Sequence, residues 1–436
     1  VASNITKTLD SWSEDHLTLS TQYAFSKGKR KYTFPRKVLG PTVSQAEAYD
    51  DMDISSLVSE FTHFGGKNVM LFAYGQTGSG KTHTMIGTDE SLRHEVANSM
   101  FDVSENCDSK TSSGVISNSG WGIFPRVYSN AVQLLGECNR PYILSASAVE
   151  FHLGACFDLL SSSPKPVQVD PDTCDLVGAT LRDMRDISDL LRFLTLVRTN
   201  RTTRSTRMNA QSSRSHAALI LYLRQMDSNS YCQTAFTLVD LAGAERPTKT
   251  KEKRFTGTDM IIWQLSKGGE VPIGAQAFIV NWELTMIATE IEKATESYKK
   301  QNRCYKQPRQ LSTDAIQFLS SGFNGTALTA MCLCLSSANV NGWETWFSLQ
   351  WGESVSKLAI PVRSQKPVNI HKALVLAERE ATMAKRELEG AAKNRFYAKR
   401  AFRVDVAYKK ISDLKHMLDS VTNADESTNS DELSSF

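Results

Sequence analysis

The 436-residue sequence lacks the features that mark membrane, secreted and metal-binding proteins. It has no run of about 18 apolar residues, so no membrane span is expected. Its first residues carry no signal-peptide pattern, and a cytoplasmic protein is therefore expected. The eight cysteines form neither a CxxC pair nor a Cys/His metal spacing, which favours reduced and mostly packed thiols.

A large excess of charge is also missing. The 50 basic and 47 acidic residues leave a formal net charge of only +3. So small an excess argues against a nucleic-acid-binding protein, and any basic site for a partner must be a local patch. The length and the hydrophobic content of 41% are typical of a soluble globular protein with a large core.

The most informative stretch is NVMLFAYGQTGSGKTHTM, from Asn68 to Met85. Its apolar start predicts a buried strand, and the phosphate-binding pattern GxxxxGK[ST] follows at 75–82. The glycines let backbone N–H groups turn toward an anion, Lys81 can reach the β- and γ-phosphates, and the Thr82 hydroxyl suits Mg²⁺. The residues expected to hold the nucleotide are Gln76, Thr77, Gly78, Ser79, Gly80, Lys81 and Thr82.

Two later stretches add to this pattern: NAQSSRSH at 209–216 and DLAGAE at 240–245. Together with FAYGQTGSGKTHTM they resemble the kinesin motor family, in the same order along the chain. The resemblance covers most of residues 30–370. It implies an α/β fold of the P-loop NTPase class, with a central mixed sheet, helices on both faces and a C-terminal neck helix. It also implies hydrolysis of ATP with Mg²⁺.

The resemblance assigns roles to the two later stretches. Ser213 would contact Mg²⁺ and the γ-phosphate, and Ser212 would lie beside the attacking water. Arg214 and Glu245 would form a gate that is made in one state and broken in another. The catalytic residues implied are Ser212, Ser213, Arg214, Gly243 and Glu245, with Gly243 donating its backbone N–H to the γ-phosphate.

Asp240 ends a predicted strand, where α/β sheets place their ligands. A carboxylate there would hold Mg²⁺ through water. The metal ligands expected are therefore Thr82, Ser213 and Asp240. His83 matches an adenine-contacting position of the family, although a histidine one residue past the loop is equally consistent with an ordinary helix surface. The Arg-x-Arg-Pro strand that the family places before the loop is absent, so the first strand is missing or truncated.

Two basic groups flank a predicted helix at 275–294, which matches the family's track-binding helix. Their charge would attract the acidic surface of tubulin; solvated charged loops are the alternative. The residues are Lys249, Lys251, Lys253 and Arg254 in the first group and Lys299, Lys300, Arg303, Lys306 and Arg309 in the second. The chain departs most from the family at 303–325, close to the second group.

Apolar patterns predict further elements. A helix is expected at 44–62, a short helix or turn at 156–160 and an amphipathic helix at 186–197. Strands are expected at 142–151, 216–223, 234–239 and 329–335, with the second and third as neighbours in the sheet. Residues 87–121 predict a long surface loop.

The resemblance divides the chain into a motor domain at 1–357, a neck linker at 358–369, a neck helix at 370–421 and an acidic, disordered tail at 422–436. The helix carries a weak, mostly alanine seam. It would either form a homodimer or fold back onto the motor. A linker after the core resembles motors that move towards microtubule plus ends.

Three functions remain as hypotheses. The first is a microtubule motor that couples γ-phosphate release to movement of the neck linker, carrying an unidentified cargo. The second is a non-motile, nucleotide-dependent microtubule-binding or scaffold protein of kinesin descent. The third, a metabolic P-loop kinase, leaves the stretches at 209–216 and 240–245 unexplained.

Overall fold

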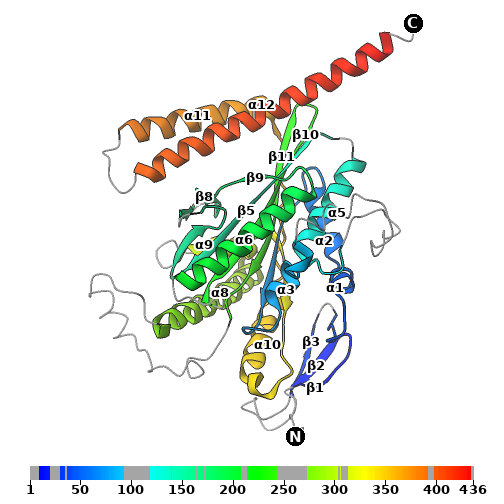
Figure 1. Cartoon of the computed structure of the whole chain (residues 1–436), viewed down its shortest axis with the longest axis vertical. Coiled ribbons are helices and arrows are strands. Elements are labelled where there is room, and N and C mark those ends of the chain that lie inside the picture. The colour runs from blue at the N-terminus through cyan, green and yellow to red at the C-terminus, as the bar shows by residue number, and fades with distance from the viewer. Residues whose placement is uncertain are drawn as a thin grey trace.

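The computed structural model describes residues 9–19, 30–34, 37–92, 118–138, 140–162, 165–170, 173–207, 214–243, 273–302, 305, 313–390 and 397–433. Within these ranges the chain forms a large central sheet, a small sheet and a pair of C-terminal helices (Figure 1). No helix in this part of the chain is long and apolar enough to cross a membrane.

The central sheet contains ten strands among the described residues. Their main order is β12 (Ala327–Leu333), β4 (Asn68–Tyr74), β11 (Ser230–Asp240), β10 (His216–Asp227), β5 (Tyr142–His152), β6 (Ala155–Asp158), β7 (Pro166–Val169) and β8 (Leu176–Val177). Strand β9 (Arg182–Asp183) pairs with β5, and β13 (Val368–Asn369) pairs with β11. The pairs β12–β4 and β4–β11 are parallel and the other pairs antiparallel, so the predicted mixed sheet is confirmed.

Helices cover both faces of this sheet because side chains alternate along each strand. Val69 and Leu71 of β4 face one core, whereas Met70 and Phe72 face the other. The first core is closed by α1 (Gln45–Asp51), α2 (Ile54–Thr62), α3 (Lys81–Met85), α5 (Ile123–Glu137) and α6 (Ile187–Arg207). The second is closed by α8 (Ile273–Gln301), α9 (Asp314–Leu319) and α10 (Gly342–Ser356). Short 3-10 turns are η2 (Glu90–Leu92), η6 (Ser320–Gly322) and η7 (Asn339–Asn341).

A small antiparallel sheet near the N-terminus packs against α10. It is formed by β1 (Leu9–Trp12), β2 (His16–Leu19) and β3 (Arg30–Thr33). Leu17, Leu19 and Tyr32 share a core with Leu349, and Arg30 pairs with Glu353 at 2.8 Å. The sequence did not predict the first two of these strands. Within the described ranges no strand adds to the outer edge of β12, and the missing first strand stays a prediction.

Two local predictions were wrong. The single helix expected at 44–62 is divided into α1 and α2 by Asp53, whose φ of 54° is left-handed. Ser44 caps α1 through the Glu47 amide, in a capping box. The short helix or turn expected at 156–160 is instead strand β6, which pairs with the end of β5. The loop expected at 87–121 is only partly described: η2 and a bridge from Gly87 to Trp121 lie at its two ends.

The neck also differs from the prediction. The structure divides the helix expected at 370–421 into α11 (Ile370–Glu389) and α12 (Tyr397–Leu433), which lie antiparallel against each other (Figure 1). The tail expected to be disordered from 422 is helical as far as Leu433. Fold-back within one chain is therefore the neck arrangement observed. The side chains of its core are Met226, Ile370, Ala373, Ala377, Ala381, Ala407, Ile411, Leu414 and Met417.

Ion pairs attach α12 to the central sheet as well as to α11. Arg224 of β10 pairs with Asp413, and Lys409 lies 3.7 Å from Asp183 of β9. Lys410 pairs with Glu380 of α11 at 3.0 Å. The exposed pairs contribute little each, so the apolar core supplies most of the attachment.

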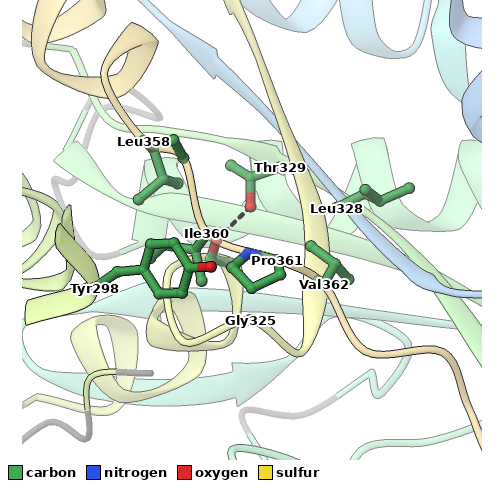
Figure 2. A pocket seen from close by; sticks show the side chains of 11 residues that line it. Tyr298, Gly325, Leu328, Thr329, Leu358, Ile360, Pro361 and Val362 are labelled. Atoms are coloured by element: carbon green, nitrogen blue, oxygen red, sulfur yellow. Dashed lines mark hydrogen bonds between the residues drawn. The ribbon is translucent and has the colours of Figure 1, made fainter. Parts of the chain in front are cut away.

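Residues 358–369, predicted as a neck linker, run from α10 to α11 along the sheet. The amide of Arg363 donates to Gly325 O at 3.0 Å, and the amide of Gln365 donates to Gly66 O at 2.7 Å. The segment then forms β13 on β11. A cavity of about 460 Å³ lies between its start, β12 and the turn at 322–325. Figure 2 shows Leu358, Ile360 and Pro361 around this cavity.

Candidate phosphate-binding site

The loop after β4 has the backbone that the glycine pattern predicted. Gly78 and Gly80 have φ values of 76° and 97°, a region that side chains with a Cβ rarely adopt. Gly75 combines a φ of 154° with a close approach, because a Cβ there would lie 2.1 Å from Cys334 O. The residue that directly follows β12, the neighbour of β4 in the sheet, therefore leaves room only for glycine at the start of the loop.

Lys81 lies inside the loop that it follows. Its Nζ donates to Gly75 O at 2.8 Å and to Gln76 O at 2.9 Å, and the residue is only 8% exposed. A buried ammonium held by neutral carbonyls keeps its charge available for an anion. Ser79 Oγ also donates to Gln76 O, and this hydrogen bond within the loop stabilises its turn.

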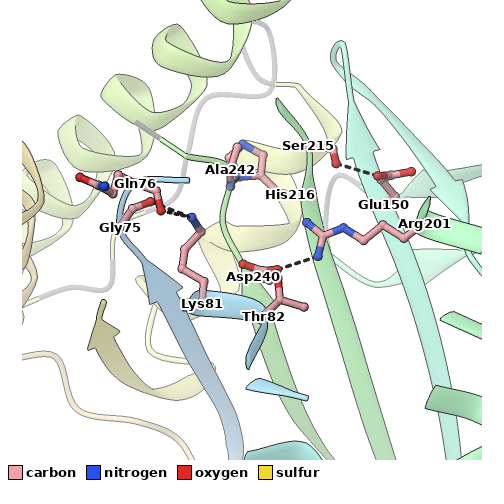
Figure 3. Close-up of polar contacts among 10 residues, drawn as sticks. All are labelled: Gly75, Gln76, Lys81, Thr82, Glu150, Arg201, Ser215, His216, Asp240 and Ala242. Carbon is pink, nitrogen blue, oxygen red and sulfur yellow. Dashed lines mark hydrogen bonds and ion pairs between the residues drawn. The ribbon is translucent and has the colours of Figure 1, made fainter. Parts of the chain in front are cut away.

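A buried carboxylate joins the loop to two other elements. Asp240 Oδ2, at the end of β11, accepts hydrogen bonds from Thr82 Oγ1 at 2.6 Å and from Arg201 Nη1 at 2.6 Å. Figure 3 shows Thr82 and Arg201 both next to Asp240, with Lys81 directed at Gly75 and Gln76. The structure thus places the predicted metal ligands Thr82 and Asp240 together.

The charge at this carboxylate follows from its surroundings. Burial alone raises the pKa of Asp240, but the charges of Arg201 and Lys81, with hydrogen bonds from Thr82 and Arg201, outweigh burial and lower that pKa. Asp240 is therefore ionised at neutral pH. Its Oδ1 is buried and accepts no hydrogen bond from the described residues. An ionised carboxylate with an open oxygen beside a hydroxyl fits Mg²⁺ and its waters.

The described part of the 209–216 stretch begins at Arg214. Ser215 Oγ donates to Glu150 Oε1 at 2.6 Å, and His152 Nδ1 donates to Arg214 O at 3.4 Å. Two side chains of β5 therefore hold the end of this stretch by hydrogen bonds. Ser212 and Ser213, predicted to lie at the attacking water and at Mg²⁺, are outside the described residues.

The described part of the 240–245 stretch ends at Gly243. The amide of Leu241 donates to Ala73 O at 3.0 Å, which continues the pairing of β11 with β4. The amide of Ala242 donates to His216 Nδ1 at 3.0 Å. Gly243 follows directly, so the predicted γ-phosphate sensor lies next to a fixed amide. Glu245 lies outside the described residues, and its gate with Arg214 stays a prediction.

His83 lies on the surface, one residue beyond Thr82. Gln45 Nε2 contacts its Nδ1 at 2.9 Å and donates to its backbone oxygen at 2.8 Å. Such a histidine is held in place and accessible, as contact with a base would need. The contact with the base stays a prediction, and the sequence did not identify Gln45.

Little of the predicted track surface is described. Lys299 and Lys300 are exposed in the last turn of α8, and Lys300 pairs with Glu296 at 3.1 Å. The remaining predicted residues lie outside the described ranges: Lys249, Lys251, Lys253, Arg254, Arg303, Lys306 and Arg309.

Sequence reasoning missed Arg201, which lies at the centre of the site. The helix was predicted only to 197. Helix α6 in fact continues to Arg207. Leu190, Leu194 and Val197 have 3-4 spacing, and Arg201 is the next position of that series, so the pattern does place it on the buried face.

Comparisons of the sequence and of the structure with known proteins point to the same family. The family model described as "Kinesin motor domain" matches residues 3–271. A solved structure described as that of a fast kinesin aligns with a TM-score of 0.61 at 21% identity, covering 84% of this chain and 89% of that chain. This likeness bears on the fold.

Curated relatives are more similar in sequence. Chromosome-associated kinesin KIF4 of Gallus gallus is 28% identical over 74% of this chain, and the kinesin heavy chain of Doryteuthis pealeii is 26% identical over 81%. The matched parts span only 23% and 33% of those two proteins. Kinesin-like protein KIN-8B of Arabidopsis thaliana is 28% identical over 76% of this chain.

Proposed function

Because the chain belongs to the kinesin motor family, we propose that it is a microtubule motor that hydrolyses ATP and couples loss of the γ-phosphate to movement of residues 358–369. The observation that carries this proposal is the set of contacts from Thr82 and Arg201 to Asp240, beside Lys81 in the glycine loop. These contacts bring three separate elements to the place where a nucleotide's phosphates would lie.

Each residue of the site has a distinct part in hydrolysis. Lys81 would exchange its two carbonyl partners for oxygens of the β- and γ-phosphates. Thr82 and Asp240 would hold Mg²⁺, directly and through water; the ion supplies charge neutralisation on the phosphate oxygens. Ser212 and Ser213 would orient the attacking water and close over the γ-phosphate. The amide of Gly243 would detect whether that phosphate is present.

The neck linker is bonded to the core in a way that supports the coupling. Its backbone bonds at Arg363, Gln365 and β13 are few and lie at the surface of the sheet. Because these bonds are few, a small change in the core can make or break all of them together, as a two-state element requires. By its position after the core, we propose movement towards microtubule plus ends.

Basic residues on both sides of α8 would hold tubulin by salt-sensitive attraction. Of these, Lys299 and Lys300 lie exposed at its C-terminal end. We place the protein on microtubules in the cytoplasm. Cargo would bind elsewhere. A homodimer through the neck would have to open the pair of α11 and α12, because Ala377 and Ala381 of the predicted seam are buried in it.

A gliding assay with steady-state ATPase measurement tests this function. We expect ATP turnover that rises several-fold with microtubules, and filament movement in ATP. Alanine at Lys81 should abolish both. A protein that neither hydrolyses ATP nor changes its affinity for microtubules between ATP and ADP would contradict the proposal.

A second function is favoured by one observation. Helix α12 attaches the neck to the sheet through Arg224–Asp413 and Lys409–Asp183, in addition to the linker's own bonds. A neck held at several points favours a non-motile, nucleotide-dependent microtubule-binding protein. That protein would bind microtubules and hydrolyse ATP without moving filaments in the same assay.

A further inference from the structure

A buried acidic residue on α8 faces the nucleotide end of the sheet. Glu283 is 1% exposed, and its Oε2 lies 3.5 Å from Nε2 of His216, which is fully buried. His216 begins β10, directly after Ser215, so the contact joins α8 to the end of the 209–216 stretch. Neither residue was singled out for a role by the sequence.

The histidine contacts the 240–245 stretch with its other nitrogen. His216 Nδ1 accepts the amide hydrogen of Ala242, so the proton of a neutral ring lies on Nε2 and points toward Glu283. Ala242 directly precedes Gly243. One imidazole ring therefore connects helix α8 with the loop that would detect the γ-phosphate.

The contact is longer than a hydrogen bond. His216 Nε2 and Glu283 Oε1 are buried and have no hydrogen-bond partner among the described residues. An N–H···O bond has a usual length of about 2.9 Å, so the two side chains are about 0.6 Å too far apart. A buried carboxylate left in this way destabilises the fold, and an apolar residue would serve the core better.

The neighbouring groups do not replace the missing partner. Glu150 accepts the hydrogen bond from Ser215, and His152 Nδ1 donates to Arg214 O. Neither side chain donates a hydrogen bond to Glu283, and among the described residues a shorter distance to His216 would supply one. A small movement of α8 toward β10 would do this.

We propose that Glu283 is a positioning residue whose contact with His216 closes in one nucleotide state and opens in another, and so transmits the state of the 240–245 loop to α8. This rests on the proposed function, because it requires nucleotide binding at the glycine loop. When the contact is closed, the ring is held from both nitrogens and the Ala242 amide is fixed. When it is open, α8 and the loop lose this direct side-chain link.

Glu290 provides a matched control. It lies on the same helix two turns further on and is similarly buried, at 3% exposure. Its Oε1 already accepts a hydrogen bond from Lys293 at 2.8 Å, and it does not contact His216. Neutralising it removes a buried acid from α8 without changing the link to the nucleotide end.

The test compares the full chain with Glu283→Leu, Glu283→Gln and Glu290→Gln. Hydrogen–deuterium exchange of peptides from α8 and from 237–243 is measured in ADP and in a non-hydrolysable ATP analogue. Microtubule affinity is measured in the same two nucleotides. Thermal melting shows whether each variant is folded; we expect Glu283→Leu to melt at or above the wild-type temperature.

In the wild type we expect exchange of α8 to differ between the two nucleotides. Glu283→Leu should remove that difference and reduce the nucleotide-dependent ratio of microtubule affinities by about fivefold or more, with nucleotide binding retained. Glu283→Gln should keep part of the effect, since its amide oxygen can accept from Nε2–H. Glu290→Gln should behave as the wild type.

The inference is overturned if wild-type α8 exchanges equally in both nucleotides, if Glu283→Leu keeps the wild-type difference, or if Glu290→Gln loses as much. Failure of the proposed motor function gives a different result. A protein that binds nucleotide but no microtubules still answers the exchange experiment, which then decides the role of Glu283 alone.

Discussion

Removal of the Arg201 charge should destabilise the fold and the phosphate site together. Arg201 is buried and its Nη1 lies 2.6 Å from Asp240 Oδ2. Breaking a buried ion pair from one side typically costs about 3–5 kcal/mol, because the remaining charge has no partner. Lys81 also lowers the pKa of Asp240 and stays in place, so we expect Arg201→Met to cost about 3 kcal/mol, at the lower end of that range.

A double-mutant cycle isolates this pair from the loss of packing. Asp240→Asn should also cost about 3 kcal/mol, since it removes the nearest carboxylate charge from the buried guanidinium of Arg201, on which Glu150 still acts. The double variant Arg201→Met/Asp240→Asn removes both charges of the pair. Its loss should be smaller than the sum of the single losses by about 2 kcal/mol. Urea unfolding at neutral pH gives all four free energies of unfolding.

The same variants separate stability from nucleotide binding. Arg201→Met keeps Thr82, Asp240 and Lys81, so it should still bind Mg·ATP more tightly than the double variant, which lacks the carboxylate. Calorimetric titration measures that order. If the losses in free energy of unfolding of the two single variants add up to that of the double variant within about 0.5 kcal/mol, Arg201 and Asp240 do not stabilise each other and the reasoning is refuted.

Three further predictions follow from the described contacts. Gly75→Ala should destabilise the protein by more than about 2 kcal/mol in urea unfolding, because its Cβ would clash with Cys334 O at a left-handed φ; equal stability would contradict this. Burial lowers the pKa of His152 in the folded protein. As pH falls below 6.5, this histidine therefore becomes protonated in the unfolded chain before it does in the folded chain. Stability should therefore fall on acidification by up to about 1.4 kcal/mol per pH unit from this group, and His152→Gln should flatten that slope in thermal melts; parallel slopes would exclude it. Leu414→Asp, in the neck core, should expose α11 and α12 to proteolysis at concentrations where the wild type and the exposed-site control Tyr408→Asp are resistant; equal cleavage of all three would mean that this core does not hold the neck.

Much of the sheet follows from the sequence because its central strands are long and apolar. Strands β4, β10 and β11 were each expected within a few residues at their nucleotide ends, where the motifs mark them. The small strand β6 was not expected: its residues are too few for a period, and it forms only by pairing with the end of β5. Asp53 likewise ends a helix through a left-handed backbone that no apolar pattern reveals.

Site residues that belong to a sequence motif could be predicted. Residues that reach the site only through the fold could not. Thr82 and Asp240 were both expected at a metal site from two distant motifs; the structure brings them into contact at 2.6 Å, and their role as metal ligands stays a prediction. Glu283 was missed because a buried acid on a helix resembles a surface charge in a sequence, and Arg201 was missed because the helix was predicted to end before it. The division of the neck depends on how α12 meets the sheet, and a weak alanine seam is compatible with either a partner chain or the chain itself.

The ladder between β11 and β13 determines how the protein would respond to a mechanical load. Only two residue pairs form it, Ser230 with Asn369 and Tyr231 with Val368, whereas eleven pairs join β10 to β11. Tension applied through the C-terminus would act first on the core and the ion pairs that hold α11 and α12 to the sheet, and would reach the short ladder only after these had given way. Residues 358–369 would then separate from β11 under little added force, whereas the eleven pairs of the β10–β11 hairpin would keep its nucleotide end intact.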